Sequence, residues 1–133
     1  MIVLDTHVLV WLDGDSADLG AEAARLIDDE FAHDGVAVSA ISFWEIAMLN
    51  TKGRLDIAKP LMLWREELLA AGLLELPVDG RLGITAADLA DFHGDPADRL
   101  IVATALSAGC NLLTADRQII DWSGTLESID ARR

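Results

Sequence analysis

Short apolar runs alternate with longer amphipathic stretches along the whole chain, and this alternation is typical of an α/β domain. The short runs predict strands at residues 2–4, 36–38, 74–76, 111–113 and 125–128. The longer stretches predict helices at residues 16–33, 41–50, 61–71, 85–92 and 96–108. Joined by short loops and right-handed crossovers, these elements give a three-layer α/β/α sandwich whose central sheet has four to five mostly parallel strands.

The length and composition predict one globular domain over residues 1–133. A chain of 133 residues with 52% hydrophobic and 25% charged residues can bury one proper core, whereas a disordered chain is poorer in apolar residues. Nothing resembles a signal peptide or the roughly 20 apolar residues of a membrane helix. The single cysteine, Cys110, has no partner for a disulfide or a zinc site. We expect it in the core of a cytoplasmic protein with no membrane association.

The formal net charge of −13 argues against broad, non-specific adhesion to nucleic acid, which depends on a basic surface. A nucleic-acid substrate remains compatible with this charge, because a bound metal ion supplies positive charge of its own. The acidic surface also favours a basic protein partner.

Four acids stand where predicted strands end or predicted helices begin. They are Asp5, Glu45, Asp98 and Asp116. Ligands of a parallel sheet collect at the carboxyl ends of its strands, where the βα loops meet. We therefore expect all four carboxylates to converge on one edge of the sheet.

Each acid also has a purely local explanation. Ser42 and Glu45 fit a capping box, and Asp98 suits the dipole at the start of its helix after a proline. Asp116 fits a helix start equally well. Asp5 directly follows three apolar strand residues, so its local explanation is weaker, although it can cap the next helix.

Taken together, the four acids indicate a divalent cation. Two carboxylates ~4 Å apart repel by about 4 kcal/mol at an effective dielectric of 20, so a cluster either takes up protons or binds a cation. Oxygen ligands favour Mg²⁺ or Mn²⁺ over zinc. Such a site suits phosphodiester hydrolysis by water, without a side-chain nucleophile.

Several neighbouring residues are candidates for supporting roles. Thr6 and Thr114 are placed to hydrogen-bond a metal ligand, although a threonine at a helix start needs no such role. Arg99 is the candidate for phosphate contact, with an ion pair to Asp95 as the competing explanation. His93 is interpreted as a loop residue rather than a ligand, because hard cations prefer oxygen. The tryptophans are interpreted as core or dimer contacts rather than base-stacking platforms, and those in apolar helical stretches are Trp11, Trp44 and Trp64.

Several motifs resemble the PIN-domain family, and within it the VapC-type toxins of type II toxin–antitoxin (VapBC) systems. In chain order they are DTHVLVW from Asp5, S-x-x-S-x-WEIA over residues 39–47, GRL at 53–55, ELPV at 75–78, HGDPADRLIVATA at 93–105 and LLTAD at 112–116. They cover nearly the whole chain, and the set is much more specific than any single motif.

This resemblance implies a PIN-like α/β/α fold and a Mg²⁺-dependent endoribonuclease, with Mn²⁺ as the alternative ion. It implies catalytic roles for Asp5, Glu45, Asp98 and Asp116. Asp5 and Asp98 are then the direct metal ligands, and Glu45 and Asp116 act through water or as outer ligands, with Asp116 counted among the metal-binding residues. It further implies a homodimer, a VapB-type antitoxin with a basic tail, and cleavage of a structured RNA, tRNA or rRNA, that inhibits translation.

The chain departs from the usual family pattern at Leu49, Gly94, Ala97 and Thr104, where relatives often have lysine, arginine, phenylalanine and glutamine. The acids are intact, so these departures concern RNA contacts and packing, with Lys52 as a substitute for the missing lysine.

Two alternatives are also compatible with the sequence. One is a catalytically inactive PIN-like interaction module, which metal titration separates from an enzyme. The other is a metal-dependent phosphohydrolase of another class. A haloacid-dehalogenase-like enzyme is disfavoured, because its second aspartate is replaced here by His7.

Overall fold

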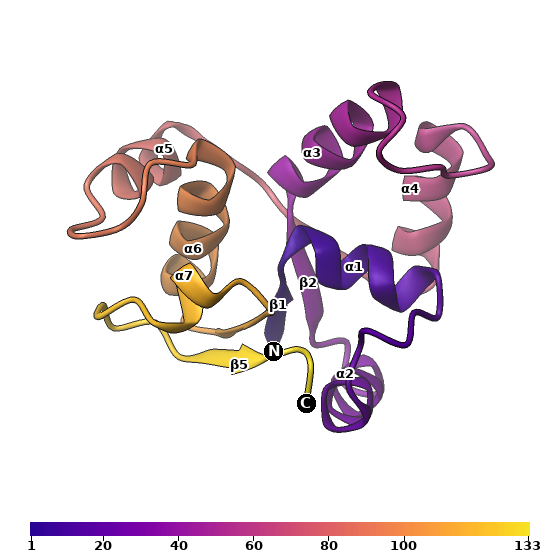
Figure 1. The fold of residues 1–133 in the computed structure, drawn as a ribbon, viewed down its shortest axis with the longest axis horizontal. Coiled ribbons are helices and arrows are strands. Elements are labelled where there is room, and N and C mark those ends of the chain that lie inside the picture. The colour runs from indigo at the N-terminus through magenta and orange to yellow at the C-terminus, as the bar shows by residue number, and fades with distance from the viewer.

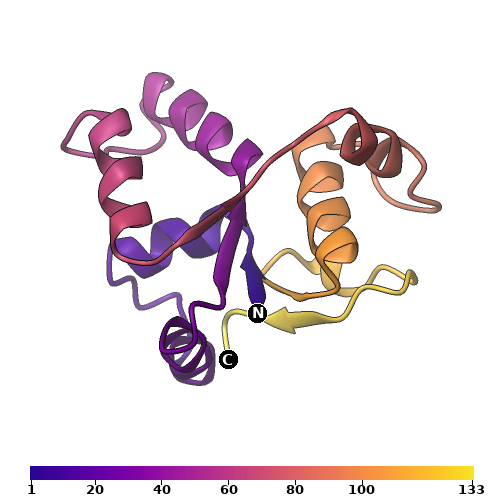
Figure 2. The same ribbon diagram turned by 180° about the vertical axis from the view of Figure 1, so that it is seen from behind.

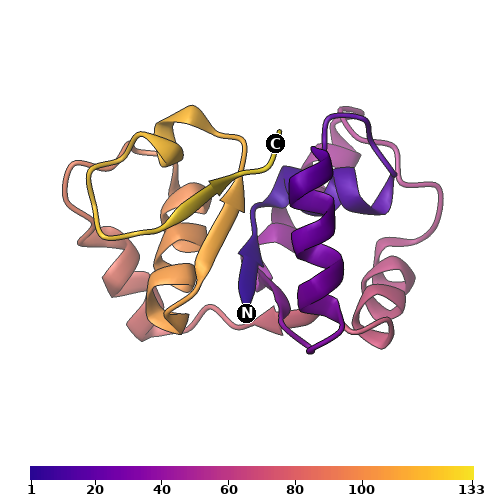
Figure 3. The ribbon, with the colours of Figure 1, turned by 90° about the horizontal axis from the view of Figure 1, so that it is seen from below.

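A parallel five-stranded sheet forms the centre of the computed structural model, which describes residues 1–133 (Figure 1). The strands are β1 (Ile2–Leu4), β2 (Val36–Ser39), β3 (Leu74–Leu76), β4 (Asn111–Thr114) and β5 (Ser128–Asp130). All neighbouring pairs in the order β3-β2-β1-β4-β5 are parallel. The first strand therefore lies at the centre, and β3 and β5 form the edges (Figures 2 and 3).

Seven helices connect these strands. They are α1 (Thr6–Asp13), α2 (Ala21–Phe31), α3 (Ala40–Thr51), α4 (Leu61–Ala70), α5 (Gly80–Ala87), α6 (Pro96–Ala108) and α7 (Arg117–Ile120). None has both the length and the apolar character that a membrane crossing requires.

The predicted α/β/α sandwich is confirmed, and its core follows the period-2 pattern of the strands. Ile2 and Leu4 of β1 face one apolar cluster with residues of α1, α2 and α4. Val3 points to the other face and packs with residues of α6 and α7. The strands are buried on both faces, as a sheet covered by helices on both sides requires. Cys110 is only partly buried, at the margin of the second cluster.

Some predicted boundaries are wrong for identifiable reasons. The helix predicted over 16–33 begins only at Ala21, because Asp15 adopts a left-handed conformation with φ 51° and the chain turns before α2. The helix predicted over 85–92 lies at Gly80–Ala87, because Asp79 caps it by accepting from Leu82 N at 2.9 Å.

The last strand begins at Ser128 rather than at residue 125. The preceding loop places Trp122 and Leu126 against the second apolar cluster, so these residues do not continue the strand. Helices α1 and α7 lie outside the predicted helical ranges.

Glycine ends three helices, as predicted, with positive φ at Gly53, Gly72 and Gly109. At Gly109 φ is 65°, and a Cβ added there would meet no atom within 4 Å. The constraint on this residue is therefore the backbone conformation rather than space.

We predict opposite effects from adding the same methyl group at two glycines. Gly109→Ala should lower the free energy of unfolding by about 1 kcal/mol, because alanine resists the left-handed conformation. Gly83→Ala should raise it by up to about 1 kcal/mol, because Gly83 lies inside α5 with open space around it. Urea denaturation measures both free energies of unfolding. A change of the same sign in the two variants would contradict the role given to the left-handed conformation of Gly109.

Candidate active site

All four predicted acids line one cleft of about 480 Å³ at the carboxyl ends of the central strands. Asp5 directly follows β1 and caps α1, and Asp116 follows β4 and caps α7. Glu45 lies in α3, which follows β2, and Asp98 lies in the first turn of α6. The parallel topology thus brings together residues from four distant parts of the chain.

Neutral hydrogen-bond donors, rather than cations, hold Asp5. Its side chain is 4% exposed. One carboxylate oxygen accepts from Thr6 N at 2.8 Å, and the other accepts from the Thr114 hydroxyl at 2.6 Å. His7 Nδ1 lies 3.6 Å from Asp5 Oδ2. Because Ala115 N donates to His7 Nε2 at 3.1 Å, that nitrogen carries no proton, and the neutral ring presents its Nδ1 proton toward Asp5.

Thr114 connects the Asp5 carboxylate to Asp116. Its buried hydroxyl donates to Asp5 Oδ2 and accepts from Asp116 N at 3.1 Å. Asp116 in turn accepts from Gln118 N at 2.9 Å, which caps α7. One threonine hydroxyl thus fixes the relative position of the two acids.

Glu45 is held by Thr6, whose hydroxyl donates to Glu45 Oε1 at 2.6 Å. Burial raises the pKa of Glu45, the Thr6 hydrogen bond opposes that shift, and the charges of Asp5 and Asp98 raise the pKa further. The capping box expected for Ser42 and Glu45 is absent. Helix α3 is capped instead by Ser39, which accepts from Ile41 N at 3.2 Å.

Ser42 belongs to the same hydrogen-bond network rather than to a cap. It is fully buried, and its hydroxyl lies 2.9 Å from the Thr6 hydroxyl. Thr6 therefore contacts Asp5 through its backbone N–H, and Ser42 and Glu45 through its hydroxyl.

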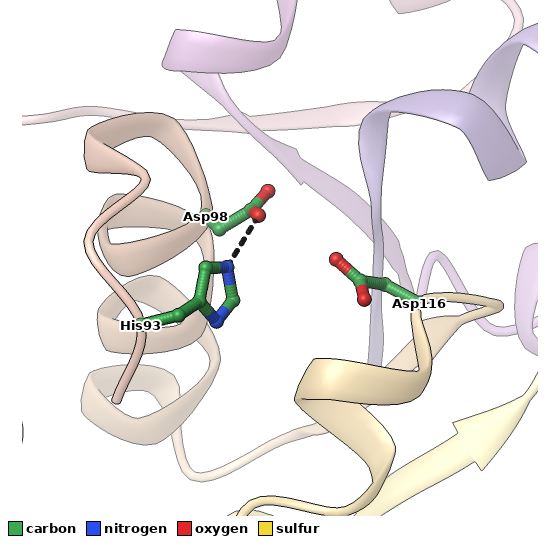
Figure 4. Close-up of side chains that lie close together, drawn as sticks. All are labelled: His93, Asp98 and Asp116. Carbon is green, nitrogen blue, oxygen red and sulfur yellow. Dashed lines mark hydrogen bonds and ion pairs between the residues drawn. The ribbon is translucent and has the colours of Figure 1, made fainter. Parts of the chain in front are cut away.

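Asp98 lies opposite Asp116 and contacts His93. Nε2 of the imidazole lies 2.8 Å from Asp98 Oδ2 (Figure 4). The Asp116 carboxylate is turned toward this pair from across the gap. Ligand atoms of His93, Asp98 and Asp116 all lie within 4.8 Å of one another.

Burial raises the pKa of Asp98, and the hydrogen bond from His93 opposes this shift. The charges of Asp5, Asp95 and Asp116 raise the pKa further. The charged groups around Asp98 are thus mostly acids, and their mutual repulsion is uncompensated without a cation.

His93 lies in a loop, as predicted, but its contact with Asp98 was not predicted. Its ring packs on Phe92 with centroids 4.2 Å apart, and its Nδ1 is buried without a partner. The sequence holds one indication of this contact, because His93 lies only five residues before Asp98. In the structure, the loop that carries His93 brings its ring to Asp98 in the first turn of α6.

The prediction that Arg99 contacts phosphate is corrected by the structure. The guanidinium donates to main-chain carbonyls of the α5–α6 connection, at Ala86, Ala87, Leu89, Phe92 and His93, over 2.7 to 3.4 Å. It forms no ion pair with Asp95 and does not line the cleft. Arg99 fastens the loop that carries His93, because those carbonyls would otherwise lack donors.

The donor set fits a hard divalent cation. Asp98 and Asp116 offer carboxylate oxygens within reach of one ion, and His93 lies in the same group but hydrogen-bonds Asp98 through its Nε2. Asp5 lies outside this closest group, but each of its hydrogen-bonded oxygens keeps a lone pair for a ligand. Carboxylates that outnumber the imidazole favour Mg²⁺ or Mn²⁺.

A family model and a curated relative both match most of this chain. The family model described as "PIN domain" matches residues 2–123. The chain is 36% identical over 119 residues to Ribonuclease VapC22 of Mycobacterium tuberculosis (strain ATCC 25618 / H37Rv), covering 89% of this chain and 88% of that protein.

Solved structures share the fold at lower identity. VapBC2 from Rickettsia felis, bound to a DNA fragment from its promoter, matches with a TM-score of 0.69 at 15% identity, over 97% of this chain and 98% of that one. FitAcB from Neisseria gonorrhoeae matches with a TM-score of 0.62 at 20% identity, over 98% of both chains.

The raised pKa values give the cation-free chain a defined pH dependence. Stability contributed by protonated Asp98 is complete below its ordinary value of 3.8 and is lost as the pH rises through the raised pKa. Relative to Asp98→Asn, the wild type should therefore lose stability as the pH rises from about 4 through that raised pKa. Mg²⁺ should reverse this loss in the wild type.

Urea denaturation in EDTA, repeated across this range, measures the effect. Asp28→Asn, at an exposed position of α2, is the matched control, and its stability should vary with pH as that of the wild type does. A wild type that gains stability over Asp98→Asn as the pH rises would contradict the raised pKa of Asp98.

We also predict that Thr114 is needed to hold the cation site. Thr114→Val should weaken Mn²⁺ binding by about 10- to 100-fold, because Asp5 and Asp116 lose their common partner. Thr104→Val is the control, because that buried hydroxyl donates only to Leu100 O within α6. Calorimetric Mn²⁺ titration measures both, and equal affinities in the two variants would contradict the role of Thr114.

Proposed function

The chain belongs to the PIN-domain family, and from this premise we propose that it is the toxin of a type II toxin–antitoxin pair, acting as a Mg²⁺-dependent endoribonuclease. The observation that carries this proposal is the cleft shared by Asp5, Glu45, Asp98 and Asp116. The name of the relative, Ribonuclease VapC22, supports RNA as the substrate. We propose that residues 1–133 form one such domain.

Side chains of the cleft suit hydrolysis by water. The hydroxyls of Thr6 and Thr114 are engaged with carboxylates, and Cys110 lies outside the cleft, so no free side-chain nucleophile is available. Water then forms the new bond to phosphorus while the bond to the 3′ oxygen breaks. The leaving 3′ oxygen takes up a proton from solvent, so that the products are a 5′-phosphate and a 3′-hydroxyl.

Each acid has a distinct role in this proposal. Asp98, Asp116 and Asp5 would hold the cation, with Mn²⁺ as the alternative to Mg²⁺. When bound, a divalent cation would lower the pKa of the attacking water and neutralise charge on the phosphodiester. Glu45, whose pKa is raised by burial, is suited to accept the proton of that water. Thr6 orients Glu45, and His93 orients Asp98.

The proposed partner is a VapB-type antitoxin that occupies the acidic cleft with a basic segment. The solved neighbours are toxin–antitoxin complexes, and the net charge of −13 favours a basic partner. Met62 and Leu63 expose apolar side chains on α4, at 77% and 45%, and offer surface for a protein contact. We further propose a cytoplasmic homodimer that cuts tRNA or rRNA and thereby inhibits translation.

We predict that the purified chain, freed of antitoxin, cleaves RNA in Mg²⁺ or Mn²⁺ and stops when EDTA is added. Asp5→Asn and Asp98→Asn should each lower the cleavage rate by more than about 100-fold, because loss of groups that merely support metal ligands already costs 10- to 100-fold. Gel analysis of labelled tRNA and rRNA measures the rate, with Asp28→Asn as control.

Circular dichroism should show that both variants remain folded. Cleavage at the wild-type rate by both variants would overturn the nuclease proposal. RNA binding without cleavage by the wild type, in either metal ion, would instead support an inactive interaction module.

A further inference from the structure

Two arginines line the acidic cleft without pairing with its acids. Arg54 and Arg132 both belong to the cleft wall, and both are exposed. Neither forms an ion pair with any carboxylate of the chain. In a protein with 23 acidic and 10 basic residues, unpaired guanidiniums beside four carboxylates need an explanation.

Most other positive groups near acids are already engaged. Lys59 pairs with Glu67, and Arg65 pairs with Glu75. Lys52, expected to replace the missing family lysine, lies outside the cleft and lines a neighbouring pocket with Arg54. Arg54 and Arg132 are therefore the cationic residues that face the cleft with donors to spare.

Arg132 is held in place at the Asp116 side. Its Nη1 donates to the carbonyl of Ala115, next to Asp116, at 3.2 Å. The guanidinium carbon lies 5.4 Å from the centre of the Trp11 ring, and that ring meets His7 edge-on at 5.0 Å. Only one of the five N–H donors of the Arg132 guanidinium is used. The guanidinium is therefore already oriented and still has free donors.

The backbone of Arg54 is fixed at the Glu45 side. Helix α3 ends in a Schellman-type turn in which Gly53 N donates to Asn50 O and Arg54 N donates to Leu49 O. Gly53 has φ 71°, which permits this turn. The side chain of Arg54 forms no hydrogen bond and lines both the acidic cleft and the adjoining pocket that contains Glu45.

We propose that Arg54 and Arg132 bind phosphates of the RNA chain on the two sides of the acidic cluster. A guanidinium presents parallel N–H donors that match a phosphate, and it stays charged at any working pH. An RNA strand entering this cleft brings further phosphates beyond the one to be cut, and these meet acids unless cations face them. This inference rests on the proposed ribonuclease function and adds the residues that position its substrate.

The segment that follows β5 brings Arg132 to the cleft. The family model matches residues 2–123, so Arg132 lies beyond the matched segment. The segment after β5 crosses to α2, where Gly20 N donates to Ala131 O and Glu22 N donates to Arg133 O. Two main-chain contacts thus fix the path that brings Arg132 to the cleft.

The test measures RNA binding separately from cutting. In a non-cutting Asp98→Asn background, the affinity for a fluorescein-labelled single-stranded RNA 20-mer is followed by anisotropy over a series of salt concentrations. Arg54→Gln and Arg132→Gln should each weaken binding by about 10-fold, the scale of one charged hydrogen-bonded contact. Each should also reduce the salt slope by about 0.7 per lost phosphate contact.

Three controls separate phosphate contact from a structural role. Arg81→Gln removes an exposed, unpaired guanidinium on α5 outside the cleft and should leave affinity and slope unchanged. Arg132→Lys keeps the charge and should restore most of the salt slope but only part of the affinity. Thermal unfolding should be unchanged in Arg54→Gln and Arg81→Gln, and only slightly lowered in Arg132→Gln, which loses its contacts with Ala115 O and Trp11. In the cutting chain, the glutamine variants should raise KM and leave kcat within about twofold.

The outcomes distinguish this inference from the function on which it rests. Wild-type RNA affinity and salt slope in both glutamine variants would overturn the arginine assignment, while cleavage by the wild type would leave the ribonuclease proposal intact. A wild-type chain that neither binds nor cuts RNA in Mg²⁺ or Mn²⁺ would overturn both.

Discussion

Repulsion among carboxylates that the sheet holds close together is the main physical constraint on this cleft. Asp5 and Asp116 are fixed at the ends of neighbouring strands, so they cannot move apart without disturbing the core. The groups that hold Asp5 are an N–H and a hydroxyl, which satisfy hydrogen bonds without cancelling charge. Burial raises the pKa values of Glu45 and Asp98, and the charges of the neighbouring acids raise them further. A divalent cation would offset the repulsion between these charges.

The same constraint explains how the cleft is built outside the acids. Thr6, Thr114 and His93 each contact a carboxylate and orient it, as the groups around a metal site commonly do. Arg99, by contrast, is used to fasten the loop that brings His93 to Asp98. Positive charge is therefore kept out of the centre, where it would compete with the cation, and reaches only the margin through Arg54 and Arg132.

Much of this arrangement could be predicted from the sequence, because it depends on repeating patterns. Apolar runs gave four of the strands, and the parallel order placed Asp5 and Asp116 together. Individual side-chain contacts between distant segments could not be predicted. Ser42 looked like a helix cap but is buried against Thr6, and Trp44 is 54% exposed although it lies in an apolar stretch. Arg99 and His93 show the same limit, because their roles depend on how one loop folds back.

Locating the bound ion would show whether these acids form a cation site. Anomalous diffraction from a crystal grown with Mn²⁺ should show a peak within about 2.0–2.3 Å of carboxylate oxygens of Asp98 and Asp116, in the gap that they share. The peak should disappear in Asp98→Asn crystals grown in the same way. A cleft without a peak at saturating Mn²⁺, or an ion bound only elsewhere, would contradict the claim that these acids converge to hold a cation.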